Sequence, residues 1–154
     1  MSLELVQSPI QITNWGDHTA VELSEGALVL MYSCLKDVHH RIMEIRRGRS
    51  RSEVKIRSVG GTMNGLRVGV YGYGFAGKAF AHLVKVLGAE VYVFDPYAKE
   101  IPAEFTRVTS LEDLFEKAQA VSIHAALTDE TRKAVTAELL AKLPDQGIVV
   151  IDNS

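Results

Sequence analysis

The segment from residue 67 to residue 88 constrains the fold of this chain more than any other part of the sequence. It begins with the apolar run Val68-Gly69-Val70-Tyr71, continues through Gly72-Tyr73-Gly74-Phe75-Ala76-Gly77, and ends in an apolar-rich stretch closed by Gly88. A strand, a glycine turn and a helix in direct succession are typical of the start of a strand–helix–strand unit. We therefore expect a strand at 67–71 and a helix at 75–87.

The glycine turn has the spacing G-x-G-x-x-G, and each glycine has a physical task. Gly72 permits the tight turn, Gly74 lets a pyrophosphate approach the backbone, and Gly77 lets the helix pack closely on the strand. The helix N-terminus also offers unpaired N–H groups and a partial positive charge to phosphates. The alternative is a purely structural turn, but the position between strand and helix favours a dinucleotide site.

Asp95 supports the same interpretation. It follows a predicted strand at 90–94 and comes 18 residues after Gly77. A carboxylate there can accept hydrogen bonds from the adenosine ribose hydroxyls and would repel a 2′-phosphate. The sequence therefore predicts NAD rather than NADP, with an ordinary Asp-Pro turn at Asp95-Pro96 as the alternative.

The rest of the C-terminal half continues the alternation of strands and helices. We expect strands at 105–108, 120–123 and 148–151, a helix at 111–118, and helical structure with a possible break at 131–143. Strands without polar alternation, such as Ile148-Val149-Val150-Ile151, suit a sheet covered on both faces. The pattern predicts an α/β fold with a doubly wound parallel sheet, in a single domain (1–154) whose core is 64–154.

The N-terminal half predicts one long helix. Thr19 and Glu22 have the spacing of a capping box, and Gly48 can end the helix. Between them, apolar residues recur in steps of three and four, at Ala20, Leu23, Ala27, Leu30, Met31, Leu35, Val38, Ile42 and Ile45. We expect a helix at 19–47, a short strand before it at 10–13, and a surface connector at 48–66 with a short strand at 54–57.

Composition excludes several function classes. The net charge of −2 is too small to steer a polyanion, and no apolar run approaches the roughly 20 residues of a membrane span. The basic residues at 46–57 have no interleaved aromatic residues, so we interpret them as a solvated connector. One cysteine excludes an internal disulfide and fits a reducing cytosol. We expect a cytoplasmic protein without a secretory signal and with no nucleic-acid or membrane partner.

Three residue types could suggest other chemistry. His39 and His40 are adjacent on a predicted helix and point about 100° apart, so they are a poor pair of metal ligands, and we expect no metal. Cys34 is interpreted as helix packing rather than a nucleophile. His124 follows a predicted strand. The residue pattern leaves two roles open for it: a catalytic base, or a residue that lines a cofactor groove.

Much of the chain resembles the cofactor domain of the D-isomer-specific 2-hydroxyacid dehydrogenases. The resemblance rests on Asn64–Val70 with the glycine turn, Phe94-Asp95-Pro96-Tyr97, Ser110–Leu114 and, most specifically, Ser122–Arg132. Ile12-Thr13-Asn14 followed by Ala20-Val21-Glu22 resembles the entry into that family's long connecting helix.

The resemblance implies which residues contact NAD. The backbones of Phe75 and Ala76 would face the pyrophosphate, Asp95 the adenosine ribose, and Pro96 and Tyr97 the adenine. The remaining implied contacts line the groove and its nicotinamide end: His124, Ala125, Ala126, Asp152, Asn153 and Ser154. It also implies that His124 is not the family's acid–base histidine, which comes later in the chain.

This sequence departs from the family's pattern. Phe75-Ala76 replace a cation and an isoleucine, which predicts weaker phosphate binding, Ala126 replaces a proline, and Asp152 replaces an asparagine. By the resemblance, the substrate-binding arginine, the acidic residue and the acid–base histidine would all follow Ser154, and we expect no substrate domain within this chain. We therefore expect no catalytic residue in this chain and no activity from it alone.

The resemblance implies that the whole enzyme transfers hydride between NAD and a 2-hydroxy or 2-keto acid. It also implies a homodimer. The alternatives are a non-enzymatic NAD-sensing module of corepressor type and a Rossmann domain from another class of oxidoreductase.

Overall fold

The computed structural model describes residues 16–50, 52–53, 61–144 and 147–151. The strands predicted at 10–13 and 54–57 lie outside the described residues, as do Asp152, Asn153 and Ser154.

Five parallel strands form one sheet in the order β3-β2-β1-β4-β5. They are β1 (Arg67–Tyr71), β2 (Glu90–Phe94), β3 (Thr106–Arg107), β4 (Ala120–Ile123) and β5 (Ile148–Ile151). The predicted doubly wound parallel sheet is therefore confirmed. The chain leaves β1 for β2 on one side and later returns to β4 on the other, so the strand order reverses between β1 and β4. Ligands of open α/β sheets bind at such a switch point, beyond the carboxyl ends of the strands.

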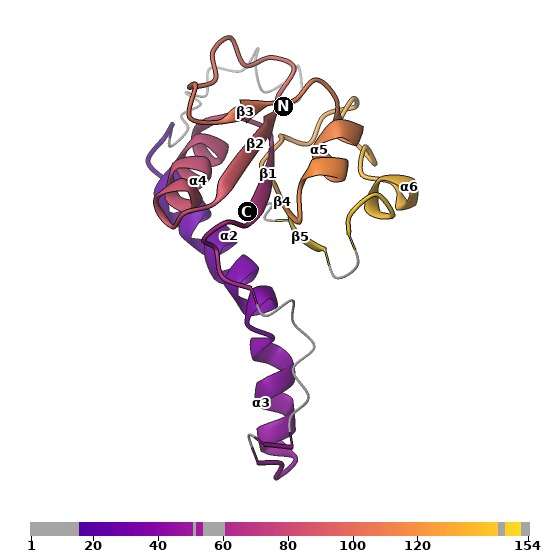
Figure 1. Cartoon of the computed structure of the whole chain (residues 1–154). Helices are drawn as coiled ribbons and strands as arrows, with labels where there is room; N and C mark the ends of the chain where they lie inside the picture. Colours follow the sequence, from indigo (N-terminus) through magenta and orange to yellow (C-terminus); the bar gives the residue numbers. More distant parts are fainter. Residues whose placement is uncertain (1–15, 51, 54–60, 145–146, 152–154) are drawn as a thin grey trace, which may run out of the picture.

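Helices cover both faces of the sheet (Figure 1). α2 (Ala20–Leu35) and α4 (Phe75–Val86) lie together on one face, whereas α5 (Leu111–Lys117) and α6 (Ala137–Leu140) lie on the other. This arrangement buries the apolar strands from both sides, as their sequences predicted.

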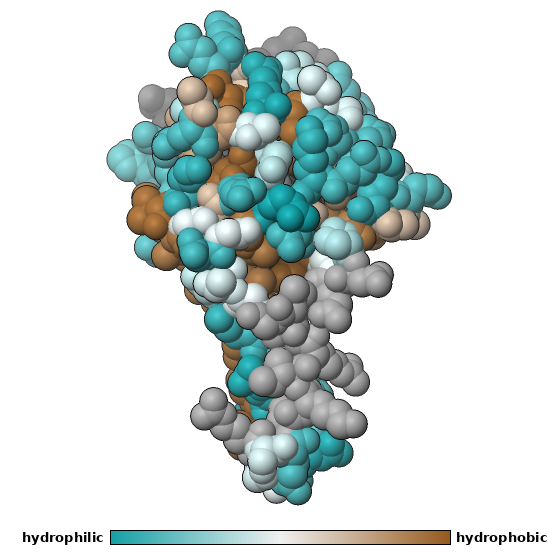
Figure 2. Space-filling model, in the orientation of Figure 1, coloured by the Kyte–Doolittle hydropathy of each residue, from teal (hydrophilic) through white to brown (hydrophobic). Residues whose placement is uncertain are grey.

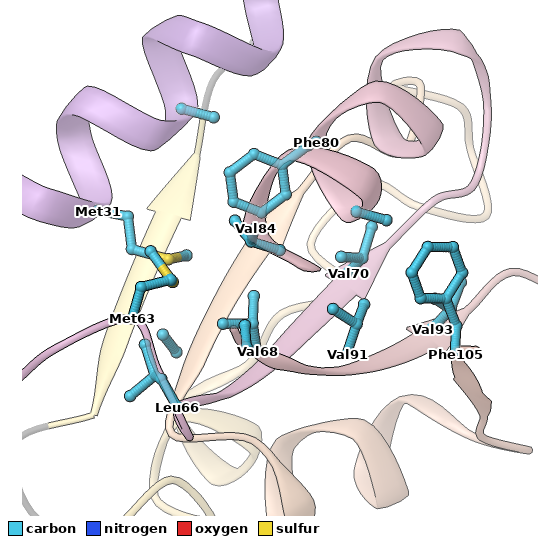
Figure 3. Packing of buried hydrophobic residues seen from close by; sticks show 14 of the residues in the cluster. Met31, Met63, Leu66, Val68, Val70, Phe80, Val84, Val91, Val93 and Phe105 are labelled. Carbon is cyan, nitrogen blue, oxygen red and sulfur yellow. The ribbon is translucent and has the colours of Figure 1, made fainter. Parts of the chain in front are cut away.

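The core beneath α2 and α4 is built from residues far apart in the chain. Figure 3 shows Phe80 and Val84 of α4 and Met31 of α2 packing toward the strand residues Val68 and Val70. All five side chains are buried. Tyr71, Leu114, Phe115 and Val121 belong to the second core cluster, on the α5 side. Together the two clusters hold the strand ends, and hence the loops after them, in fixed positions.

The prediction of a single helix at 19–47 is wrong, because the helix breaks after Leu35. Asp37 has φ 52°, a left-handed conformation that cannot continue a right-handed helix, and a second helix, α3 (Val38–Arg46), begins after it. Asp tolerates this conformation better than most residues. Lys36 donates to the Gly61 carbonyl at 2.7 Å, which ties the break to the connector.

The break also changes which apolar residues are buried. Ala20, Ala27, Met31 and Leu35 of α2 are buried as predicted. α3 projects away from the sheet (Figure 1), and its residues Val38, Ile42 and Ile45 are 38%, 46% and 63% exposed. The predicted apolar face therefore belongs to the core only along part of α2, because Leu30 of that face is 47% exposed.

Two finer predictions about α2 are also wrong. The Thr19 side chain makes no capping hydrogen bond, because Thr19 itself has helical dihedral angles rather than the extended ones of a capping residue. Cys34 is exposed, so it does not pack in the core.

The helix predicted at 131–143 is reduced to the four residues of α6. At the start of this segment the Thr131 side chain bonds to the preceding backbone. Its Oγ1 accepts from the Thr128 N–H at 2.8 Å and donates to the Ala126 carbonyl at 2.6 Å. Such local bonds compete with a helix. Lys133 has φ 59°, and α6 begins only at Ala137, where Thr136 Oγ1 accepts from the Leu139 N–H at 3.4 Å.

Candidate cofactor-binding site

The glycine turn lies at the point where the strand order reverses. Gly72 has φ +91°, and a Cβ placed on it would come within 2.6 Å of the Ala125 backbone nitrogen. The turn after β1 therefore touches the segment after β4, and only a glycine with a positive φ fits between them. The His124 N–H donates to the Tyr71 carbonyl at 2.7 Å on the same edge.

The third glycine of the motif allows α4 to begin directly against the turn. A Cβ on Gly77 would lie 2.0 Å from the Gly72 carbonyl oxygen, a distance that no real Cβ contact shows. The predicted packing role of Gly77 is thus confirmed by the geometry of the turn.

Gly74 differs from the other two glycines because the space around it is open. It caps the N-terminus of α4 with ordinary extended dihedral angles, and apart from its neighbours in the chain no atom lies within 4 Å of where its Cβ would be. The next residues, Phe75 and Ala76, begin the helix, and the Phe75 side chain is 62% exposed. Backbone N–H groups in this first turn have no partner within the helix. This geometry can admit a pyrophosphate.

Asp95 connects the loop after β2 to the glycine turn. Its Oδ2 accepts a hydrogen bond from the Tyr73 N–H at 2.6 Å, while its Oδ1 accepts from the Tyr97 and Ala98 N–H groups at 2.7 and 3.0 Å. A carboxylate has about four accepting positions. The described partners of Asp95 use three of them, so Oδ2 can still accept from a ribose hydroxyl.

The Asp95 side chain lines a cavity of about 610 Å³ together with Gly74. The cavity walls also include Tyr97 and two lysines, Lys78 of α4 and Lys99 of the loop after β2. The open backbone at Gly74 and the Asp95 carboxylate therefore border one cavity.

The Tyr97 side chain links the loop after β2 to the loop after β4. Its hydroxyl donates a hydrogen bond to Glu130 Oε2, and this bond raises the pKa of Tyr97 above its usual value. The ring is 73% exposed. Of the two predicted adenine residues, Tyr97 lines the cavity and is linked to the loop after β4, whereas Pro96 is exposed and is not among the cavity walls.

His124 is held from two sides. Its Nε2 lies 2.9 Å from the Ser122 hydroxyl, and its ring centroid lies 5.0 Å from that of Phe80. His124 is half-buried at the end of β4, beside the glycine turn. Its place at the switch point suits the groove-lining interpretation of this residue.

Sequence reasoning missed four residues of this site: Tyr73, Lys78, Lys99 and Glu130. Tyr73 and Lys78 flank the glycines, so their nearness to the turn was visible in the sequence. Lys99 and Glu130 reach the site only through loop conformations, and no local pattern indicated them.

Among the described residues, no group of three or more His, Cys, Asp or Glu side chains could hold a metal ion. No helix in the described part of the chain is both long and apolar enough to cross a bilayer.

Comparison with known proteins agrees with this geometry. Residues 28–151 match the model of the D-isomer-specific 2-hydroxyacid dehydrogenase NAD-binding domain. The chain belongs to this family. The resemblance noted from the sequence is therefore confirmed, and NAD is the cofactor of the domain to which the chain belongs. The comparisons add no support for a module of corepressor type.

Individual relatives are similar over most of the chain. A hydroxypyruvate reductase from Thermotoga maritima is 25% identical over 148 residues, which are 94% of this chain and 46% of the relative. A 2-hydroxyacid dehydrogenase A from Aspergillus oryzae is 27% identical over 90% of this chain and 39% of its own length. The chain thus spans less than half the length of these curated relatives.

A crystal structure of a D-lactate dehydrogenase from Treponema pallidum has the same arrangement. It superposes with a TM-score of 0.76 at 26% identity and covers 86% of this chain and 40% of the dehydrogenase.

Proposed function

We propose that this chain holds NAD for a protein that transfers hydride between the nicotinamide and a 2-hydroxy or 2-keto acid. The observation that carries the proposal is the shared cavity, in which the open backbone at Gly74 and the carboxylate of Asp95 face the same space. When bound, NAD supplies the hydride chemistry, and the protein binds and orients it.

Each part of the cofactor has a proposed partner in the chain. The Phe75 and Ala76 N–H groups would bind the pyrophosphate, and Asp95 Oδ2 would accept from a ribose hydroxyl. Pro96 and Tyr97 would contact the adenine, and His124, Ala125 and Ala126 would line the groove. We also place Asp152, Asn153 and Ser154 at its nicotinamide end, on the resemblance alone.

The proposal extends to the domain and its setting. Residues 1–154 would form one NAD-binding domain with its core at 64–154, in a cytoplasmic homodimer. The substrate-holding arginine and the acid–base pair would come from residues outside 1–154. A hydride transfer to a keto acid needs a proton donor and a group that holds the carboxylate.

Calorimetric titration of the 154-residue chain with NAD and NADP tests the cofactor assignment. We expect NAD to bind more tightly, because Asp95 would repel the 2′-phosphate. Tighter binding of NADP would contradict the role given to Asp95. In a parallel assay with NADH and a panel of 2-keto acids, we expect no turnover, and measurable turnover would place catalytic groups within this chain.

A further inference from the structure

Two side chains beside the glycine turn form a hydrogen bond that the cofactor proposal does not use. Ser122 of β4 is completely buried, and its Oγ lies 2.9 Å from Nε2 of His124. Residues two apart in an extended chain point to the same face of a sheet. Ala120, two residues before Ser122, belongs to the core cluster beneath α2 and α4, so the Ser122 and His124 side chains lie on that face as well.

The His124 side chain packs between β4 and α4. Its ring centroid lies 5.0 Å from that of Phe80, whose side chain on α4 is completely buried. A Cβ on Gly77, in the first turn of α4, would lie 3.4 Å from the His124 Cβ. The side chain thus fills the space between the end of β4 and the start of α4, and the bond to Ser122 fixes the direction of its ring.

The hydrogen bond between these two residues has a preferred direction. Nε2 of His124 is the partner that the described residues give the buried Ser122 hydroxyl. A neutral histidine can donate or accept at this nitrogen. If Nε2 donated, the buried O–H would be left without an acceptor, which is costly. Ser122 therefore donates, Nε2 accepts, and the proton of the neutral ring is on Nδ1.

We propose that Ser122 and His124 are positioning residues for the glycine turn. Ser122 holds the neutral His124 ring with its proton on Nδ1, and the ring holds the N-terminus of α4 at its distance from β4. This distance sets where the Phe75 and Ala76 N–H groups meet a pyrophosphate. The ring thus acts on the cofactor through the turn, while the His124 backbone lies against Gly72. The inference rests on the proposed cofactor role of this site.

Nuclear magnetic resonance of the chain without ligand tests the hydrogen bond. The unmodified chain is compared with Ser122→Ala, which removes the hydroxyl, and Ser122→Thr, which keeps it on a residue that suits strands. The imidazole nitrogen signals of His124 should show the proton on Nδ1 in the unmodified chain, and a shift toward Nε2 in Ser122→Ala. The amide signals of Gly74 and Gly77 should move at the same time. Ser122→Thr should restore both.

Ser24 provides a matched control. It is also buried, but its hydroxyl donates to the Val21 carbonyl at 2.7 Å, within α2 itself. Ser24→Ala therefore removes a buried serine hydrogen bond without removing a partner of His124. We expect it to leave the His124 nitrogen signals unchanged.

Calorimetric titration with NAD links the pair to cofactor binding. Ser122→Ala should weaken NAD binding about fivefold, as the loss of one hydrogen bond would give, and Ser122→Thr should restore it. Ser24→Ala should change the affinity by less than about twofold. In a His124→Phe background, which keeps a ring beside Phe80, Ser122→Ala should have no further effect, because the serine acts through the histidine.

Three outcomes would overturn the proposal. They are a proton on Nε2 of His124 in the unmodified chain, equal losses of NAD affinity from Ser122→Ala and Ser24→Ala, and a full loss from Ser122→Ala in the His124→Phe background.

The same measurements separate this inference from the proposed function. If the unmodified chain binds NAD but Ser122→Ala changes neither the nitrogen signals nor the affinity, the positioning role is refuted and the NAD-binding role stands. If the unmodified chain does not bind NAD, the proposed function is refuted. The signals of His124 and Gly77 without ligand then still decide whether Ser122 positions the ring and the turn.

Discussion

At the scale of single residues, the three glycines of one motif have different physical roles, and only the structure separates them. Gly72 and Gly77 are required by contacts within the protein: added Cβ atoms would meet the backbones of Ala125 and Gly72 at 2.6 and 2.0 Å. Gly74 has open space around it and ordinary dihedral angles. The first two are therefore needed for folding, and Gly74 is available for function.

This difference predicts opposite outcomes for two substitutions. Gly74→Val should abolish NAD binding, because a side chain there would occupy the approach of the pyrophosphate, while the free energy of unfolding changes by less than about 1 kcal/mol. Gly77→Ala should lower the free energy of unfolding by about 1–3 kcal/mol or more, since the helix must move away from the turn. Urea denaturation and calorimetric NAD titration measure the two effects. Unchanged NAD affinity in folded Gly74→Val would mean that the turn is only structural.

At the scale of secondary-structure elements, two helices with similar starting sequences begin in different ways. Ser110 has extended dihedral angles, and its Oγ accepts from the Asp113 N–H at 3.0 Å at the start of α5. Thr19 precedes α2 with helical dihedral angles and makes no such bond. A capping side chain stabilises a helix only where the preceding backbone is extended, so the same sequence signal has different consequences.

Alanine substitution at the two positions should show this difference. Ser110→Ala should lower the free energy of unfolding by about 1 kcal/mol, because it leaves the Asp113 N–H without its partner. Thr19→Ala is the matched control and should change it by less than about 0.5 kcal/mol. Equilibrium urea denaturation gives both values. Equal losses would show that Thr19 caps α2 in solution.

At the scale of the whole molecule, α3 extends the hydrophobic surface beyond the sheet. Figure 2 shows hydrophobic atoms on the projecting segment as well as on the body. Val21, Val29 and Leu30 of α2 are 60%, 63% and 47% exposed, and Ile42 and Ile45 of α3 are similarly open. Clusters of exposed apolar side chains of this kind are commonly covered by a partner.

We therefore expect a homodimer that covers α2 and α3. Light scattering should give about twice the chain mass of 16.9 kDa. Replacing Ile42 and Ile45 together with glutamate should return the mass to that of one chain, because charges would be buried in the interface. Val86→Glu is the control, since Val86 is 85% exposed at the end of α4 and should not affect assembly. A mass near that of one chain at all concentrations would refute the dimer.

The sequence by itself determined the parallel sheet and its principal strands, and it indicated the proposed cofactor site at the centre of the sheet. The strands at 67–71, 90–94, 120–123 and 148–151 were predicted with the bounds that the structure has. Apolar runs bounded by glycine or polar residues are local signals, and the switch point follows once the strands are ordered. Asp95 and the glycine turn could be assigned to one site for the same reason.

Only the tertiary structure decided where the long helix breaks and which loops meet at the site, because both depend on contacts between residues that are distant in sequence. The apolar period through 19–47 continues across Lys36 and Asp37, yet the helix breaks there, and Lys36 bonds to Gly61. The lysines beside Asp95 and the Tyr97–Glu130 bond join loops that are separate in sequence. Apolar periodicity indicates which face of a helix or strand is apolar. The conformations of loops, and the side-chain contacts between them, depend instead on the packing of the whole chain.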